Sequence, residues 1–391
     1  MKDTRPERLR IPLFRILWDK NDVGYVKAAI ESGENWAIGP NVSEFEKKIA
    51  HHTGSKYCSV FNSGTSALHA ALLAYGIKKD DEVIVPSFTF ISTANSVIFV
   101  GAKPVFADIE EKTLGLDPED VIKKISKKTK AIMPVHYGGC PCKIRELRKI
   151  ADENNLLLIE DASEAFDARI GERKVGTFGD SGIFSFCQNK IITTGEGGAI
   201  VTDSYEIDKK LRILRSHGKS ESGSDSFTSN NPDYTSIGYN FRMSNITAAL
   251  GIAQLMKVNR IIEKRRRNAE SYTKDLKERV KEITTLLPPK NYYNVHQMYT
   301  IRAKQRDELM GHLTKKGIAT KVYFHPVHLS HYYRKVLKTK CRLPVTEEIS
   351  KEILSLPMYP GLQKNEIRYI VDKIEEFYSS SPDHNTGIRE Q

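Results

Sequence analysis

The stretch between residues 57 and 203 alternates apolar runs with helical patterns, and this alternation restricts the fold more than any other feature of the chain. Turn residues follow the apolar runs, and helical segments such as SALHAALLAYG separate them. Strands that alternate with helices favour a mainly parallel sheet with helices packed on its faces. We therefore predict an α/β domain, with strands at YCSVF, DEVIVP, AKPVFAD, KAIMPVH, LLLIEDA, GIFSF and GAIVTD.

The length of 391 residues exceeds what one ordinary hydrophobic core supports, so we expect two domains. We assign a large α/β domain, with the N-terminal segment, to residues 1–250 and a smaller α+β domain to residues 251–391. A long helix over residues 245–278 is expected to bridge them, because small and apolar residues in ITAALGIAQLMKVNRII recur at helical spacing. The second domain is predicted to contain a strand at YTIRA, a helix at RDELMGHLTKKG, a strand at IATKVYF and a closing helix after Lys364.

One polar segment, HGKSESGSDSFTSNNPDYTS at residues 217–236, has little apolar content. Its Ser, Gly, Asn and Asp residues are typical of a loop. Loops of this length inside compact domains are commonly functional or disordered.

The formal net charge of +11 is compatible with nucleic acid, an anionic membrane surface or acidic small molecules as partners. The basic residues lie in short clusters, and the RRR run at 265–267 sits among helix formers, so we interpret them as solvated helix faces.

MKDTRPERLR lacks a following apolar region, and no stretch is long enough to span a bilayer. We expect a cytoplasmic protein with no membrane or nucleic-acid partner. The five cysteines form no recognisable ligand set, so we expect no metal site.

A Ser-Gly-Thr turn at residues 63–65, in FNSGTSALHAAL, lies between a predicted strand and a predicted helix. Backbone N–H groups at a helix N-terminus bind phosphate, and the hydroxyls of Ser63 and Thr65 supply further donors. An N-cap residue without any ligand produces the same pattern. The turn alone therefore indicates a phosphate site only weakly.

A second candidate group is the acid that follows the strand LLLIEDA. Asp161 comes at the end of this buried strand, and Glu164 follows shortly after it. The carboxyl ends of parallel strands are where open α/β sheets bind ligands. A helix-capping aspartate is an equally good explanation of this position when it is considered alone.

The third candidate is a lysine in FSFCQNKIITTGEGGAIVTD. Lys190 lies between two apolar strands, just before a glycine-rich turn, and Ser185 precedes it by five residues. Lysine forms imines with carbonyls, and partial burial favours the neutral amine that this reaction needs. An ordinary surface lysine remains the alternative on position alone.

The three signals together match the requirements of pyridoxal 5'-phosphate. This cofactor needs a phosphate cradle, a carboxylate that keeps its pyridine nitrogen protonated, and a lysine that forms an imine. The turn at 63–65, Asp161 and Lys190 supply these groups in a workable order along the chain. We therefore predict a pyridoxal phosphate enzyme.

From about residue 10 to 370 the chain resembles the sugar aminotransferases of the DegT/DnrJ class. The resemblance implies the aspartate-aminotransferase-like fold (fold type I), in which the large domain has a mainly parallel, seven-stranded mixed sheet. Within the class, NKIITTGEGG is most similar to the perosamine synthases and related 4-aminotransferases. The resemblance is carried by GPNVSEFEKKIA, NSGTSALHAAL, PSFTFISTANSV, PVHYGG, IEDASEAF, FSFCQNKIITTGEGG, IGYNFRMSNITAALGIAQL, FHPVHLSHYY and LSLPMYP.

The resemblance also implies roles for individual residues. Lys190 would hold the cofactor and shuttle a proton between the donor and the cofactor. Asp161 would pair with the pyridinium nitrogen, and Phe90 in PSFTF would stack on the ring. The phosphate would be bound by residues of the turn and the strand before the lysine, namely Ser63, Gly64, Thr65 and Ser185.

Other positions carry roles that depend on the resemblance more heavily. Asn240 in GYNFRM resembles the residue that reaches the phosphate in the neighbouring subunit, which implies a homodimer with composite sites. Glu164 stands near the cofactor's phenolic oxygen, where many relatives have Gln or His. Cys187-Gln188 replaces the commoner Phe/Tyr-Gly pair. His328 in HPVH aligns with a histidine close to the substrate, and a hydrogen-bonded structural histidine is the alternative.

The function implied is ping-pong transamination, from L-glutamate as donor to the ketone of a nucleotide diphosphate 4-keto-6-deoxy sugar. A 3-keto sugar, or a UDP- or dTDP-linked sugar, is the alternative within the class. A dehydratase of the class would, by resemblance, have histidine in place of Lys190. A non-catalytic regulatory protein on the same fold is possible in principle but would be expected to have lost the lysine or the acid.

Overall fold

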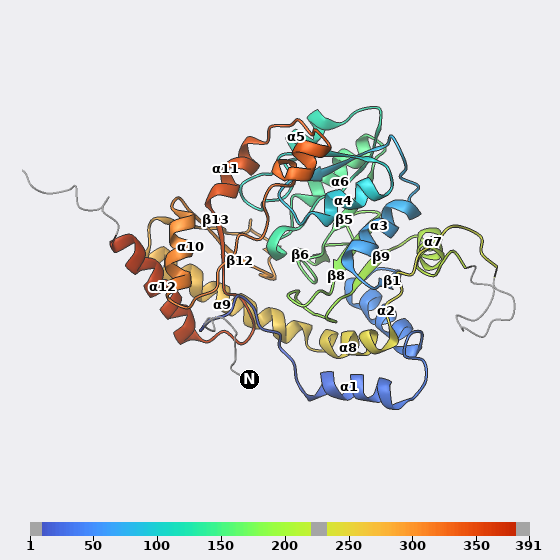
Figure 1. The fold of residues 1–391 in the computed structure, drawn as a ribbon, viewed down its shortest axis with the longest axis horizontal. Coiled ribbons are helices and arrows are strands. Elements are labelled where there is room, and N and C mark those ends of the chain that lie inside the picture. The colour runs from blue at the N-terminus through green and yellow to red at the C-terminus, as the bar shows by residue number, and fades with distance from the viewer. Residues whose placement is uncertain (1–9, 220–232, 381–391) are drawn as a thin grey trace, which may run out of the picture.

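The structure is a computed structural model that describes residues 10–219 and 233–380 (Figure 1). Its centre is a seven-stranded sheet with the order β1-β9-β8-β5-β4-β2-β3. Neighbouring strands from β8 to β3 are parallel, whereas β9 is antiparallel to both of its neighbours, β1 and β8. The mixed, mainly parallel sheet is thus confirmed. Its strands are β1 (Tyr57–Phe61), β2 (Glu82–Pro86), β3 (Lys103–Ala107), β4 (Thr129–Ile132), β5 (Leu157–Asp161), β8 (Ser181–Ser185) and β9 (Gly198–Thr202).

Helices cover both faces of this sheet because alternate strand residues are apolar on each side. Val83 and Ile159 share a buried cluster with residues of α3 (Gly64–Ala74), α4 (Ser92–Phe99) and α7 (Tyr205–Arg215). The other face packs against α2 (Pro40–Thr53) and α8 (Asn245–Leu255) near β1 and β9. Further along, that face packs against α5 (Pro118–Lys124) and α6 (Ile144–Glu153).

The C-terminal part of the chain has its own antiparallel sheet, in the order β10-β12-β13. A separate buried cluster joins this sheet to three helices, as the predicted α+β composition requires. The division at residues 250 and 251 stays a prediction. The elements are α9 (Val258–Arg279), β10 (Ile283–Thr285), β12 (Tyr299–Ala303), α10 (Arg306–Lys315), α11 (Pro344–Glu352), β13 (Ile353–Leu356) and α12 (Lys364–Ser379).

Two short features complete the described chain. The helix α1 (Lys20–Glu31) packs against α8. A small sheet joins β6 (Arg169–Ile170) to β7 (Arg173–Lys174) and to β11 (Tyr292–Tyr293). No helix in the described ranges is long and apolar enough to cross a membrane.

The structure corrects two predictions about elements. The single helix over residues 245–278 is wrong, because α8 ends at Leu255 and α9 begins at Val258. At the break the buried Lys257 ammonium forms ion pairs with Asp19 and Asp22. These pairs attach the N-terminal segment to the junction between α8 and α9. The strand at IATKVYF is also wrong: only isolated bridges occur, from Ile318 to Ile11 and from Lys321 to Ser355. Of the polar loop, residues 220–232 lie outside the described residues.

Candidate active site

Most of the predicted site residues line one cavity at the carboxyl ends of β5 and β8, with a volume of about 500 Å³. This is the edge of the sheet where parallel α/β proteins bind their ligands. The residues come from segments far apart in the chain, so only the folded sheet brings them together. The predicted residues in the lining are Ser63, Gly64, Thr65, Phe90, Asp161, Glu164, Ser185 and Lys190.

One side of the cavity is the N-terminus of α3. Ser63 is the N-cap, and its hydroxyl accepts a hydrogen bond from Ser66 N–H at 3.1 Å. The N–H groups of Gly64 and Thr65 come before that bond, and the first N–H groups of a helix have no acceptor within it. The turn is therefore both an ordinary helix cap and a start that presents two amide donors. These donors give this side of the cavity the geometry for an anion.

Gly64 is required here because Ser185 approaches it closely. A Cβ atom at position 64 would lie 3.0 Å from Ser185 Cβ and 3.1 Å from its Oγ. Because Gly64 has no side chain, the hydroxyl of Ser185 at the end of β8 can lie next to the start of α3. Thr65 Oγ1 makes a 2.8 Å hydrogen bond with Ser92 Oγ at the start of α4. Hydroxyls and amides from three elements thus converge on a small volume.

Asp161 is buried at the end of β5, and its carboxylate does not cap a helix. Oδ2 accepts a 2.8 Å hydrogen bond from Thr93 Oγ1, and Oδ1 accepts one from Ser163 N–H at 3.1 Å. Thr93 in turn shares a 2.9 Å hydrogen bond with Thr89. A carboxylate has about four acceptor positions. Asp161 therefore keeps acceptor capacity toward the cavity that it lines.

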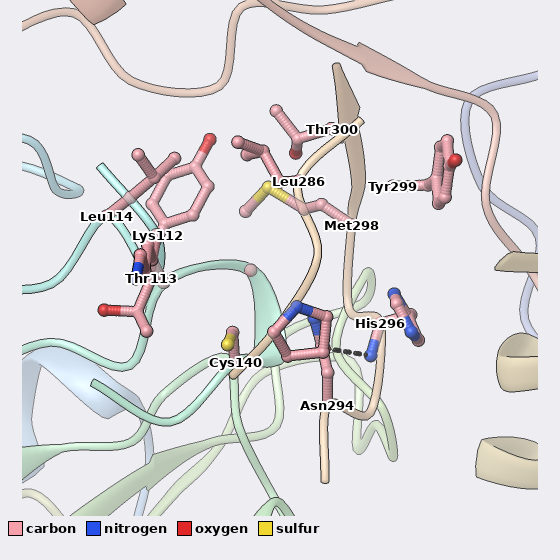
Figure 2. A pocket seen from close by; sticks show the side chains of 13 residues that line it. Lys112, Thr113, Leu114, Cys140, Leu286, Asn294, His296, Met298, Tyr299 and Thr300 are labelled. Carbon is pink, nitrogen blue, oxygen red and sulfur yellow. Dashed lines mark hydrogen bonds between the residues drawn. The ribbon is translucent and has the colours of Figure 1, made fainter. Parts of the chain in front are cut away.

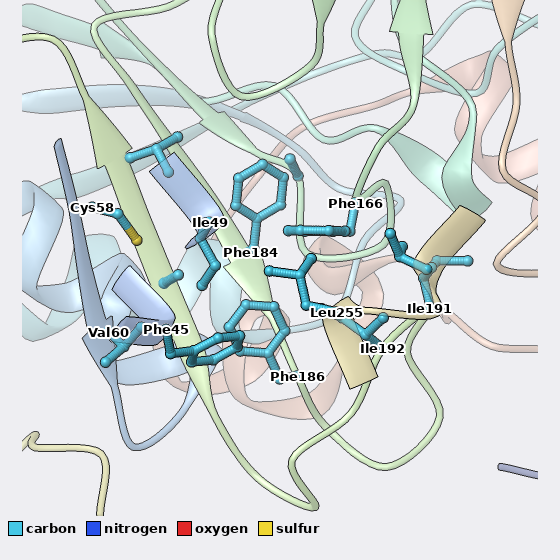
Figure 3. Close-up of a cluster of buried hydrophobic side chains, with 14 of the residues drawn as sticks. Phe45, Ile49, Cys58, Val60, Phe166, Phe184, Phe186, Ile191, Ile192 and Leu255 are labelled. Atoms are coloured by element: carbon cyan, nitrogen blue, oxygen red, sulfur yellow. The ribbon is translucent and has the colours of Figure 1, made fainter. Parts of the chain in front are cut away.

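Lys190 is held in place by the residues that follow it. Ile191 and Ile192 are 3% and 1% exposed and belong to the buried cluster shown in Figure 3. On the other side, Gln297 Nε2 donates a 2.5 Å hydrogen bond to the carbonyl oxygen of Asn189. The backbone at Lys190 is thus fixed on one side by the buried cluster around Ile191 and Ile192. On the other side it is fixed by the segment that leads into β12. Its side chain reaches the cavity with 15% of its surface exposed.

Glu164 lies against the lysine in this structure. Its Oε1 is 3.2 Å from Lys190 Nζ, and its Oε2 accepts a hydrogen bond from Gly138 N–H at 2.9 Å. Burial raises the pKa of Glu164, and the Lys190 charge and the Gly138 N–H offset part of that rise. The predicted neighbour of the cofactor is therefore also the charge partner of the predicted cofactor lysine.

The rest of the lining includes residues that sequence reasoning missed. One of them is Phe324, whose ring centroid lies 6.4 Å from that of the predicted Phe90, so the two rings line the same side of the cavity. Leu13 and Phe14 bring the N-terminal segment into the lining, and Lys321 brings in a cation from beyond α10. Thr93 also lines the cavity, and the sequence offers a partial signal for it, because it follows Phe90 by three residues in PSFTFISTANSV.

Two predicted residues do not line this cavity. Asn240 is exposed, and its backbone oxygen accepts a 3.2 Å hydrogen bond from Asn62 Nδ2. His328 is buried, with Nδ1 2.6 Å from Ser87 Oγ and Nε2 3.4 Å from Glu347 Oε1. Burial lowers the pKa of His328. Its contacts agree with the structural alternative, and its catalytic role stays a prediction.

A second cavity, shown in Figure 2, lies between the segment around Lys112 and the segment that enters β12. Its volume of about 30 Å³ is too small for a cofactor or a sugar. The backbone N–H of His296, in the lining, donates a 2.7 Å hydrogen bond to Asn294 Oδ1. Burial lowers the pKa of the His296 ring to about 3. It contains none of the predicted site residues.

Comparison with known proteins identifies the family to which the chain belongs. The model of the DegT/DnrJ/EryC1/StrS aminotransferase family matches residues 17–375. GDP-perosamine synthase of Escherichia coli O157:H7 is 37% identical over 371 residues, which cover 94% of this chain and 99% of that protein. GDP-perosamine synthase of Vibrio cholerae is 36% identical over 374 residues, with coverage of 94% and 99%. Helicobacter pylori PseC, an aminotransferase involved in the biosynthesis of pseudoaminic acid, matches with a TM-score of 0.89 and 29% identity, over 95% of this chain and 100% of PseC.

The sheet order and the likeness to solved aminotransferases define the class: the protein has the α/β, aspartate-aminotransferase-like fold predicted from its motifs. Within that class it belongs to the DegT/DnrJ/EryC1/StrS aminotransferase family. The enzymes of this family are pyridoxal phosphate-dependent sugar aminotransferases, and this chain is one of them.

Proposed function

We propose that this enzyme, which is similar to GDP-perosamine synthases, transfers an amino group from L-glutamate to the ketone of a nucleotide diphosphate 4-keto-6-deoxy sugar. The observation that carries the proposal is the meeting of Lys190, Asp161 and the α3 N-terminus around one cavity. The two GDP-perosamine synthases, each matched over almost its whole length, support the sugar class.

The residues of the cavity fit pyridoxal phosphate, which when bound supplies an electron sink for the carbon that loses its proton. Gly64, Thr65 and Ser185 would bind the phosphate, because their donors converge where a Cβ at position 64 would otherwise intrude. Ser63 would contribute through the cap that orders this turn. Asp161, already oriented by Thr93, would accept the hydrogen bond of the pyridine nitrogen and keep it protonated.

The remaining residues would act on the reacting atoms and on the substrate. Lys190 would bind the cofactor through Nζ and, once released, carry the proton between the donor carbon and the cofactor. Phe90 would lie against the cofactor ring, since its own ring is exposed in the cavity. Lys321, whose Nζ lies 5.0 Å from the centroid of the Tyr323 ring, lines the cavity and supplies a cation that suits an anionic substrate.

We also propose that the enzyme is a homodimer in which Asn240 enters the partner's site. Asn240 is exposed and absent from the cavity of its own chain, which supports a contact with a second copy. Ile237 and Tyr234 nearby are 84% and 61% exposed, a degree of exposure that apolar side chains at an interface would show before assembly.

The experiment that tests the proposed function uses purified protein, glutamate and a panel of GDP-, UDP- and dTDP-linked keto sugars. Mass spectrometry of the products should show one amino sugar, and we expect the GDP-linked 4-keto-6-deoxy sugar to be converted. Conversion of a 3-keto, UDP- or dTDP-linked sugar alone would select the alternative within the family. No conversion with any sugar, despite bound cofactor, would exclude the substrate class.

A second measurement addresses Lys190 directly. Purified protein should show visible absorption from the lysine-bound cofactor, and Lys190→Ala should abolish both this band and turnover. Lys321→Ala, in the same cavity, is the control, because it removes a cation and should leave the band in place. A visible band that survives in Lys190→Ala would assign the cofactor to another residue.

A further inference from the structure

Glu164 makes a contact that the proposed roles do not use. Its Oε1 lies 3.2 Å from Lys190 Nζ, and the two side chains are 5% and 15% exposed. Gly138, within the turn Tyr137–Gly139, donates its N–H to Oε2 at 2.9 Å. Because a backbone group fixes one carboxylate oxygen, the other is held toward the lysine nitrogen. The contact is built by the fold and does not depend on two mobile surface side chains.

The groups around Glu164 leave Lys190 as the cation that faces it within the described part of the chain. Burial raises the pKa of Glu164, and the negative charge of Asp161 on β5 acts in the same direction. The phenol of Tyr137 faces Glu164 from the turn with Gly138, and that of Tyr323 faces it from the segment after α10. Burial raises the pKa of both phenols, so they are neutral near pH 7.

We propose that Glu164 is the counter-ion of the Lys190 nitrogen, and that it holds a proton there both when the lysine is free and when it carries the cofactor. The inference rests on the proposed function, because it requires Lys190 to be the cofactor lysine. An opposite charge within about 4–6 Å favours the charged form of an ionisable group, and the 3.2 Å contact places Glu164 inside that range. Only an N–H bond at Nζ is made or broken, and its electron pair stays on the nitrogen.

The role differs from a contact with the cofactor's phenolic oxygen. In that case Glu164 would act on the lysine nitrogen only through the bound cofactor and would have no effect on the free lysine of the apoprotein. As counter-ion, it sets the pH at which Nζ changes from proton donor to proton acceptor. Transamination needs both states of this nitrogen, because the same lysine removes a proton from one carbon and returns it to another.

The test is a pH titration of the visible absorption of cofactor-loaded protein, which depends on whether the lysine nitrogen carries a proton. Glu164→Gln keeps the length of the side chain and the acceptor for Gly138 N–H but removes the charge. We expect its titration midpoint to lie at least about one pH unit below that of the wild type, since burial then opposes the protonated nitrogen unaided. A contact with the phenolic oxygen alone would leave the pH profile of cofactor capture by the apoprotein unchanged.

Glu196→Gln is the matched control, because it removes a carboxylate from the same cavity. Glu196 contacts Cys187, with Sγ to Oε1 at 3.5 Å, and makes no contact with Nζ. Its midpoint should move much less than that of Glu164→Gln. An unmoved midpoint in Glu164→Gln, or an equal shift in both variants, would overturn the proposal.

A second readout applies if Glu164→Gln retains too little cofactor for the titration. The rate at which apoprotein captures added pyridoxal phosphate should reach half its maximum at a lower pH in Glu164→Gln than in the wild type. Identical pH profiles would contradict the counter-ion role. Failure of the proposed function is distinguishable, because it would appear as a missing lysine-dependent band in the wild type itself.

Discussion

Asp161 shows at the scale of single residues how the site is prepared before any ligand arrives. A buried carboxylate is costly unless it is hydrogen-bonded, and Asp161 is bonded on both oxygens, by Thr93 Oγ1 and by Ser163 N–H. The same bonds fix the direction of the side chain. Thr93 is thus a positioning residue for the carboxylate proposed to meet the pyridine nitrogen.

Replacing Thr93 with valine keeps the shape of the side chain and removes the hydroxyl. We expect Thr93→Val to lower the free energy of unfolding in urea by about 1–3 kcal/mol, because Asp161 Oδ2 loses its donor in a buried site. Turnover should fall with it. Thr89→Val is the control: the Thr89 hydroxyl bonds to Thr93 at 2.9 Å and not to Asp161, so its effect should be smaller. A neutral Thr93→Val would show that water replaces the hydroxyl.

Residue identities were predictable where a motif required them, and contacts were not. Asp161 ends one strand and Lys190 follows another, and the parallel sheet brings both strand ends to one edge. The contact between Glu164 and Lys190 depends on how one turn places the N–H of Gly138, which has a φ of +60°. No local pattern in PVHYGG specifies that direction. Side-chain pairs of this kind need the folded backbone.

At the scale of elements, the packing of α8 on α2 depends on Gly251. A Cβ atom at this position would lie 2.5 Å from the ring of Phe45, which is fully buried. We expect Gly251→Ala to lower the free energy of unfolding by about 1–3 kcal/mol through overpacking. Phe45→Leu in the same chain should restore part of the loss, because the smaller side chain makes room for the methyl group. Additive effects of the two substitutions would contradict this contact.

A buried charge cluster joins α2, β1 and α7 on the edge of the sheet. Glu46 pairs with Arg215 and with Arg212, and it accepts a 3.0 Å hydrogen bond from Val60 N–H. Burial alone would raise the pKa of Glu46, but the two guanidinium groups outweigh it and hold that pKa below its usual value. The stabilisation from Glu46 is therefore fully present above its unfolded pKa of about 4.3 and is lost as the pH falls through the lower folded value.

We expect Glu46→Gln to cost about 3–5 kcal/mol of unfolding free energy at pH 7, because it leaves buried guanidinium charge uncompensated. The difference from the wild type should shrink as the pH falls below the folded pKa of Glu46, and urea unfolding across a pH series measures it. Glu44→Gln is the control on the same helix, since its pair with Lys48 is exposed. A difference that stays constant with pH would show that the charge of Glu46 is not the cause.

Elements were predictable where periodicity was strong, and boundaries were not. The strands of the large sheet and the helices α10 and α12 follow from apolar patterns in the sequence. The break between α8 and α9 interrupts a pattern that continues across it, because the apolar spacing carries no record of Lys257 pairing with Asp22. IATKVYF has the composition of a strand but lacks a continuous partner, and strand formation requires one.

At the scale of the whole molecule, the proposed homodimer predicts complementation between two inactive variants. In a mixed dimer of Lys190→Ala and Asn240→Ala, one composite site carries both substitutions and the other carries neither. Random mixing should therefore restore about a quarter of wild-type activity. Each variant is measured alone and after co-expression, with light scattering to establish the dimer. No recovery from a mixed dimer would show that Asn240 acts within its own chain.

The position of β1 in the sheet has a consequence for synthesis on the ribosome. The strand that pairs with β1 in the described sheet is β9, which begins at Gly198, and an isolated bridge joins Phe61 of β1 to the still later Arg242. At roughly 5–20 residues per second, the apolar strand YCSVF emerges on the order of ten seconds before its partner exists. During that interval its unpaired edge is open to association with other chains. The phosphate turn follows β1 directly, so it reaches Ser185 only after β9, and the lysine segment before β9, have been made. The cofactor can therefore enter only a chain that is already translated beyond Lys190 and β9.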